Sequence, residues 1–67
     1  PPADTLSPRE QQILDLVARG FTYPEVAEQV RVSLNTTHTH IRNIYGKLGV
    51  HNKTEAVFEA RQIGLLR

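Results

Sequence analysis

The segment from Ser33 to Gly49 constrains the fold most, because it carries a helix start, a helix stop and two faces of different character. Ser33 is a preferred N-cap residue, and glycine at position 49 is the residue that most often ends a helix. At about 100° per residue, one face collects Leu34, Thr37, Ile41, Ile44 and Leu48. A second face collects Asn35, His38, Thr39, Arg42 and Gly46, and a flanking row collects Thr36, His40, Asn43 and Lys47. The pattern predicts a helix over 34–48 that packs through its apolar face and leaves its polar face free to contact a ligand.

Three further segments carry helix-start signals. Ser7, Pro8 and Glu10 form a capping-box pattern, and a second such pattern begins at Thr22. Asn52 is the N-cap of the last segment, which stops before Gly64. These signals predict helices over about 8–19, 23–30 and 53–63. Because the connection 31–33 is so short, the second and third helices must cross steeply, and the predicted fold is an all-α, four-helix helix-turn-helix domain.

Positive charge gathers in one part of the chain. The 67 residues have a net charge of only +1, but no Asp or Glu lies between Glu28 and Glu55. That interval contains Arg31, Arg42, Lys47, Lys53 and all three histidines. The distribution predicts a cationic surface on one side of the fold, suited to an anionic partner.

Length and composition exclude several classes of protein. A chain of 67 residues makes one domain, which we place at 6–67 behind a linker stub at 1–5. Because cysteine, long apolar runs and a signal-peptide pattern are absent, we expect a cytoplasmic protein without a membrane span. His38 and His40 lie about 200° apart around a helix and cannot share an ion. We therefore expect no metal site, and we also expect no cofactor. Because no serine or cysteine lies beside a base, we expect no enzymatic activity.

Several separated motifs, in order, resemble the LuxR-type (GerE-like) helix-turn-helix domain, the C-terminal output half of many bacterial response regulators and quorum-sensing regulators. The motifs are Leu6-Ser7-Pro8-Arg9-Glu10, Gly20, Glu25-Val26-Ala27, Ser33 with Thr36 and His40, Lys47-Leu48-Gly49-Val50, Thr54-Glu55-Ala56-Val57 and Gly64-Leu65-Leu66. The resemblance implies binding to double-stranded DNA, with the third helix in the major groove. It also implies a weak homodimer formed on DNA through the fourth helix, and a regulatory domain before Pro1.

The same resemblance assigns individual residues to roles. It implies that base edges are read by His38, Thr39 and Arg42, and that phosphates are contacted by Thr36, Asn43, Lys47 and Lys53. On the fourth helix, a small domain cannot bury every apolar position, so we expect exposed Val57 and Ala60 to form the dimer contact. The chain departs from the family in two places: Thr37-His38 stands where Val-Lys is usual, and Tyr23-Pro24 where Asn-Lys or Asn-Arg is usual.

A second hypothesis competes with DNA binding. The domain could instead be a small helical protein-interaction module that keeps this architecture and uses its fourth helix or its polar face against another protein. Low net charge, His38 and Pro24 favour this alternative, whereas Arg42, Lys47 and Lys53 in an acid-free run favour DNA.

Overall fold

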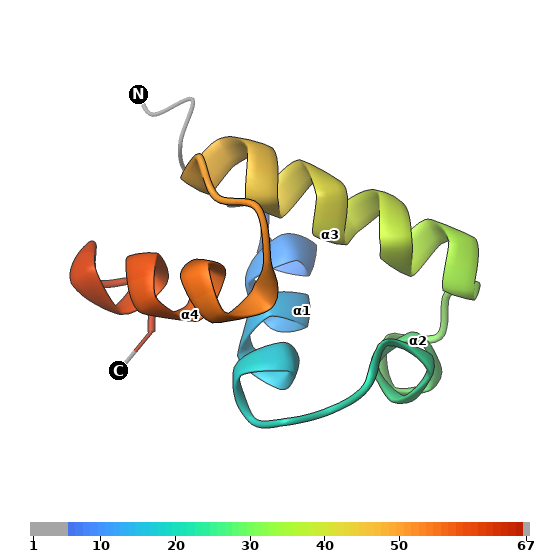
Figure 1. The fold of residues 1–67 in the computed structure, drawn as a ribbon. Coiled ribbons are helices and arrows are strands. Elements are labelled where there is room, and N and C mark those ends of the chain that lie inside the picture. Colours follow the sequence, from blue (N-terminus) through green and yellow to red (C-terminus); the bar gives the residue numbers. More distant parts are fainter. Residues whose placement is uncertain (1–5, 67) are drawn as a thin grey trace.

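The computed structural model describes residues 6–66, and in that range it contains four helices and no strand (Figure 1). The helices are α1 (Pro8–Ala18), α2 (Tyr23–Val30), α3 (Leu34–Leu48) and α4 (Lys53–Gln62). The all-α fold class is confirmed, and α2 and α3 have the predicted bounds. The first and last helices end one residue earlier than predicted, because Arg19 and Ile63 act as caps. The proposed linker stub at 1–5 lies outside the described residues.

Local signals in the sequence account for where each helix begins. Ser7 and Thr22 form complete capping boxes with the glutamates three residues on, at 2.8–3.3 Å. Ser33 and Asn52 accept single hydrogen bonds from the backbones of Thr36 and Glu55. Pro24 fits into the first turn of α2, where a backbone N–H has no partner within the helix.

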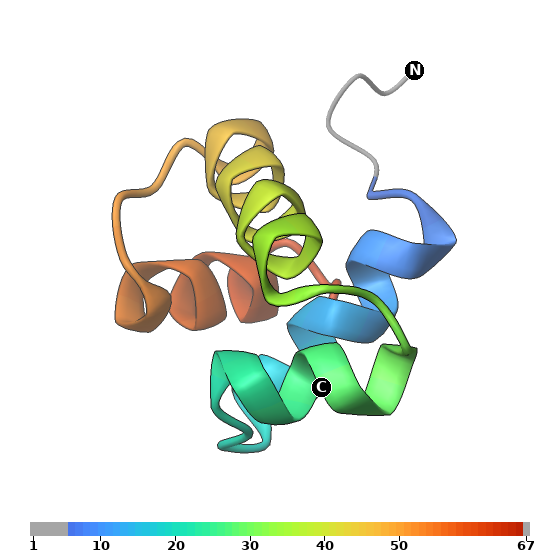
Figure 2. The ribbon, with the colours of Figure 1, turned by 90° about the vertical axis from the view of Figure 1, so that its right-hand side faces the viewer.

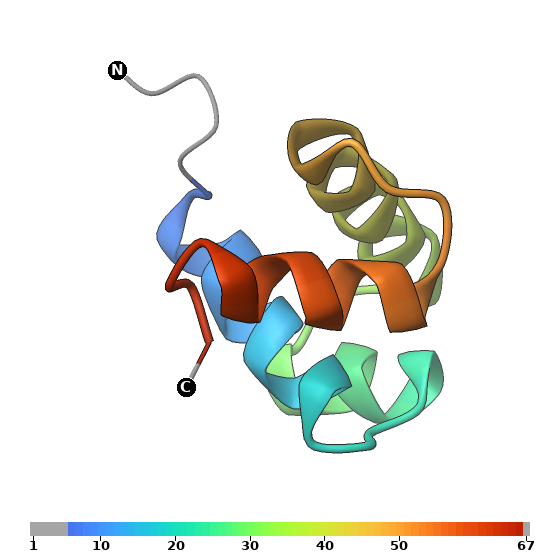
Figure 3. The ribbon, with the colours of Figure 1, turned by 60° about the vertical axis from the view of Figure 1, so that its left-hand side comes forward.

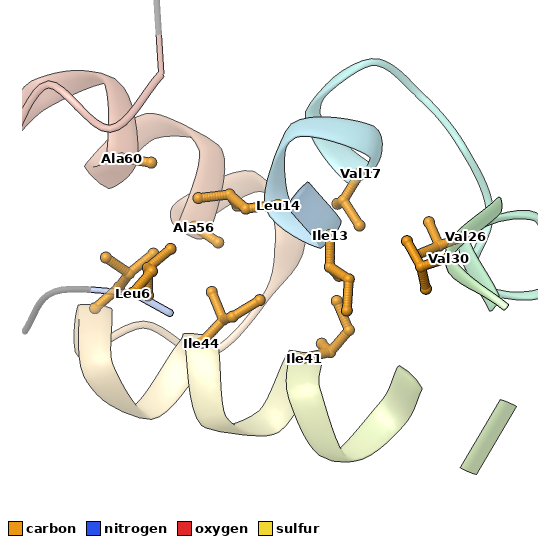
Figure 4. Close-up of a cluster of buried hydrophobic side chains, with 11 residues drawn as sticks. Leu6, Ile13, Leu14, Val17, Val26, Val30, Ile41, Ile44, Ala56 and Ala60 are labelled. Atoms are coloured by element: carbon orange, nitrogen blue, oxygen red, sulfur yellow. The ribbon is translucent and has the colours of Figure 1, made fainter. Parts of the chain in front are cut away.

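The four helices enclose one core (Figure 4). In Figure 1, α3 crosses above α1, with α2 beside its N-terminal half and α4 beside its C-terminal half. Ile13, Leu14 and Val17 from α1 are at most 1% exposed and meet the equally buried Val26 of α2 and Ile44 of α3. Because α1 fills the middle of the molecule, α3 is left with one whole side facing outward.

The connection between α2 and α3 is a tight turn, seen at the right of Figure 2. Arg31 adopts the left-handed conformation at φ 61° and ψ 47°, and the Val32 backbone N–H donates to Ala27 O at 3.1 Å. The Arg9 guanidinium donates to Val30 O at 2.7 Å and so caps the end of α2. This turn redirects the chain within three residues and sets the angle at which α3 is presented.

Helix α4 lies across the front of the domain in Figure 3 and is held mainly by small side chains. Ala56 and Ala60 are both 0% exposed, and the Gln11 side chain donates to Leu65 O at 2.8 Å just after the helix. The expectation that Ala60 is exposed is therefore wrong, because α4 approaches closely enough to cover it completely. None of the helices within residues 6–66 is long and apolar enough to cross a membrane.

Candidate nucleic-acid interface

The outward side of α3 is a continuous polar surface. Its exposed residues are Asn35, Thr36, His38, Thr39, Arg42, Asn43 and Gly46. The opposite side is buried through Thr37, Ile41, Ile44 and Leu48, so the two faces lie where the periodicity predicted them. Leu34 is the exception at 41% exposed, because the first turn of α3 extends past the core. In the flanking row, His40 and Lys47 are half-buried.

Hydroxyl groups on α3 are already oriented by bonds to their own helix. Thr39 Oγ1 donates to Asn35 O at 3.1 Å, which leaves its lone pairs to accept a hydrogen bond from outside. Thr36 Oγ1 accepts from Ser33 Oγ at 2.9 Å and can donate its own hydrogen outward, as to a phosphate oxygen. The buried Thr37 donates to Ser33 O at 3.1 Å, so the hydroxyl at this usually apolar position is satisfied within the fold.

Arg42 is the permanent cation in the middle of the exposed face. Within residues 6–66 the ion pairs are Lys47–Glu10 and His51–Glu55, so Arg42 is unpaired in that part of the chain. Its planar guanidinium can donate two parallel hydrogen bonds to one guanine edge. The structure thus leaves Arg42 available for the base-reading role that the resemblance assigns to it.

Lys47 differs from the other proposed contacts because it already forms an ion pair within the fold. Its Nζ is 2.6 Å from Glu10 Oε1, and the two side chains are 33% and 7% exposed. Burial favours a raised pKa for Glu10, but the Lys47 hydrogen bond, the Ser7 backbone N–H and the Lys47 charge outweigh it and lower the pKa. Lys47 therefore joins α3 to α1, and it has two further N–H donors that can reach an anion.

His38 contacts Tyr23, which is in turn hydrogen-bonded to Tyr45, at the α2 edge of the same face. The ring centroids of Tyr23 and His38 are 5.6 Å apart with an interplanar angle of 71°, an edge-to-face contact. The Tyr23 and Tyr45 hydroxyls are hydrogen-bonded at 2.8 Å. Burial, with the contribution of Tyr23, raises the pKa of Tyr45, so that hydroxyl stays protonated.

The remaining proposed contacts lie on and near α4. Lys53 is exposed at the first position of the helix, where the positive end of the helix dipole also favours an anion. Val57 is half-buried, whereas its neighbour Phe58 is 63% exposed. Phe58 borders a shallow depression lined by Val50, Thr54, Glu55 and Glu59. Sequence reasoning missed Phe58, although an aromatic residue on the polar side of the last helix was a signal that could have identified it.

Four helices, a tight turn between the second and third, and an exposed polar face on the third define a helix-turn-helix domain. The family described as "Bacterial regulatory proteins, luxR family" matches residues 4–60. The chain belongs to this family, and it is a LuxR-type helix-turn-helix DNA-binding domain of transcriptional regulators. The family expected from the sequence motifs is thereby confirmed.

Individual relatives agree with the family match. The chain is 43% identical over 58 residues to the HTH-type transcriptional regulator MalT of Serratia proteamaculans (strain 568) and 41% identical over 58 residues to MalT of Yersinia pestis (strain Pestoides F). Each alignment covers 87% of this chain and 6% of the relative, so the chain spans a small part of these proteins. A solved structure of the transcription factor GerE superposes with a TM-score of 0.86, 32% identity and 92% of both chains covered.

Proposed function

We propose that this chain binds double-stranded DNA sequence-specifically, with α3 in the major groove, as the C-terminal output domain of a cytoplasmic bacterial transcriptional regulator. The observation that carries the proposal is the exposed polar face of α3, held outward by a core that buries only the opposite face. A helix of this width fits the major groove of B-form DNA. The much greater length of the MalT relatives supports a regulatory domain before Pro1, as in response regulators.

The polar face offers donors and acceptors that suit different parts of the duplex. Base edges would be read by His38, Thr39 and Arg42 in the centre of the face. Phosphates would be contacted by Thr36 and Asn43 on the flank of α3, by Lys47 at its end and by Lys53 at the start of α4. The acid-free stretch between Glu28 and Glu55 supports this division, because it leaves α3 without a carboxylate to repel DNA.

Pairing on DNA is the second part of the proposal. The outer side of α4 carries Val57 and the exposed Phe58, and we propose that it forms a weak two-fold contact with a second copy. A symmetric pair requires inverted half-sites about one helical turn apart. The buried Ala60 has no part in this contact.

A salt titration on two duplexes tests the proposal. The affinity of the chain for a random duplex and for the upstream region of its own gene is measured by fluorescence anisotropy at several salt concentrations. We expect tighter binding to one upstream segment, and a log–log salt slope of about −2 or steeper for both duplexes, since two lysines are proposed as contacts and each phosphate neutralised by a lysine contributes about −0.9. Binding that is absent, or independent of salt, would instead support the protein-interaction module.

A further inference from the structure

Three aromatic rings form a connected row at the edge of the proposed base-reading face. Tyr23 comes from the first turn of α2, whereas His38 and Tyr45 come from α3. The two α3 residues are seven positions apart, about two helical turns, and so lie on nearly the same side of the helix. Tyr23 contacts both of them, one through its ring and the other through its hydroxyl.

Tyr23 is held at both ends. Its backbone follows Thr22, whose capping box with Glu25 fixes the start of α2. Its hydroxyl is hydrogen-bonded to Tyr45 at 2.8 Å. Because a tyrosine has only two side-chain torsions, fixing both ends leaves its ring almost no freedom to move. The ring therefore forms a rigid wall on the α2 side of His38.

This wall limits where the His38 imidazole can point. The edge-to-face contact, with centroids 5.6 Å apart, favours the His38 rotamers that keep it by about two- to tenfold over those that lose it. His38 is otherwise exposed, so without Tyr23 its ring would sample several orientations in solvent. A side chain ordered before binding loses less entropy when it meets a base pair.

We propose that Tyr23 is a specificity-determining positioning residue, which uses its bond to Tyr45 to hold the His38 imidazole in the orientation that reads one base pair. Neither tyrosine reads a base in this arrangement. The inference rests on the proposed function, because it assigns His38 to a base pair in the major groove.

Base-preference profiles of matched variants test the inference. The affinity of each variant is measured for the preferred duplex, for duplexes with single base pairs changed, and for random DNA. We expect Tyr23→Leu to lower discrimination by about two- to tenfold at the base pair that His38→Gln also affects, with random DNA bound as before. In the double variant, discrimination should be no lower than in His38→Gln alone. Equal losses on all duplexes, or additive losses at different base pairs, would overturn the inference.

The hydroxyl pair offers a second route that leaves all rings in place. Tyr23→Phe and Tyr45→Phe both remove the bond between the hydroxyls, so each should give the same partial loss of discrimination, and the double variant no more. Thermal unfolding of each variant shows whether the fold persists. If either phenylalanine variant keeps full discrimination while folded, the bond does not position His38 and the inference fails.

A measurement without DNA separates this inference from the proposed function. Three-bond couplings and contacts between the His38 and Tyr23 rings, measured by NMR, report the His38 rotamers in the free chain. We expect one dominant rotamer in the wild type and averaged couplings in Tyr23→Leu. Averaged couplings in the wild type overturn the inference alone. A wild type with one rotamer but no base preference overturns the proposed function, and the base-reading step falls with it.

Discussion

Lys47 Nζ lies 2.6 Å from Glu10 Oε1, and the same carboxylate oxygen accepts the Ser7 backbone N–H at 2.9 Å. One carboxylate thus closes the first turn of α1 and holds the C-terminal end of α3. With Glu10 only 7% exposed, this contact is shielded from solvent much more than a surface ion pair. It fixes the C-terminal end of α3 to the centre of the fold.

Glu10 should make stability depend on acid pH. Its pKa is lower in the folded chain than the ordinary value of 4.5, so its contribution is fully present above pH 4.5. As the pH falls through the folded-state pKa, the carboxylate is protonated and that contribution is lost. We expect Glu10→Gln to lower the free energy of unfolding at pH 7 by about 1–3 kcal/mol. Urea unfolding should show the difference from wild type shrinking below pH 4.5, whereas the exposed Glu28→Gln serves as a control with little effect. A difference that is constant from pH 7 to pH 3 would contradict this assignment.

Arg42→Ala should weaken binding to the specific site by about 1–3 kcal/mol and relax preference at one base pair, because the guanidinium lies on the exposed face and has no ion-pair partner among residues 6–66. Competition binding with single-base-pair variants of the site measures both effects. Arg19→Ala, at the end of α1 away from α3, removes the same charge and should change neither. Equal weakening on specific and random DNA would place Arg42 on a phosphate instead.

The two lysines should differ in how their loss affects salt dependence and stability. Lys53 is exposed and unpaired within residues 6–66, so Lys53→Ala should lower the magnitude of the salt slope by about one without lowering stability. Lys47→Ala should give a smaller decrease in slope, because Glu10 partly neutralises Lys47 in the free protein, and it should also lower the melting temperature. Anisotropy titrations and thermal unfolding measure the two quantities. The phosphate roles fail if neither variant changes the slope.

Phe58 should matter for pairing and not for binding a single half-site. It is 63% exposed on α4, so Phe58→Ser should leave stability within about 0.5 kcal/mol of wild type. On a duplex with two inverted half-sites, we expect the variant to lose cooperative binding, with half-site affinity unchanged. Sedimentation velocity with single and paired sites tests this, with the exposed Gln62→Ser on the same helix as the control. Wild-type chains that occupy paired sites independently at every spacing would argue against an α4 contact.

Local sequence signals predicted most of the fold, but they could not predict contacts between segments that are distant in the chain. Capping residues and 3.6-residue periodicity depend on near neighbours in the chain, so the helix bounds and the two faces of α3 followed from the sequence. The same periodicity cannot show which neighbour covers a face. For that reason the prediction that Ala60 is exposed is wrong, and the pairing of Lys47 with Glu10, 37 positions apart, could not be predicted.

The site could be predicted to the same extent. Spacing along one helix shows which residues share a face, but not which residues another helix brings to that face. Spacing identified the exposed row that includes His38 and Arg42, but not the ring of Tyr23, which reaches His38 from another helix. Arg31 shows a further limit. Glycine is the usual signal for a left-handed residue, and this turn uses an arginine instead.

Helix α4 is attached to the core through two buried alanines, and this affects how readily it opens. Burying an alanine removes little apolar surface from water. The packing of α4 against the core is therefore stabilised less than that of a helix that buries leucines. Segments with few buried apolar groups open first and exchange their amide hydrogens fastest. A second copy bound at Phe58 would contact only the folded helix and would lower the population of the open form by mass action. Slower amide exchange in α4 would then show that a second copy is bound.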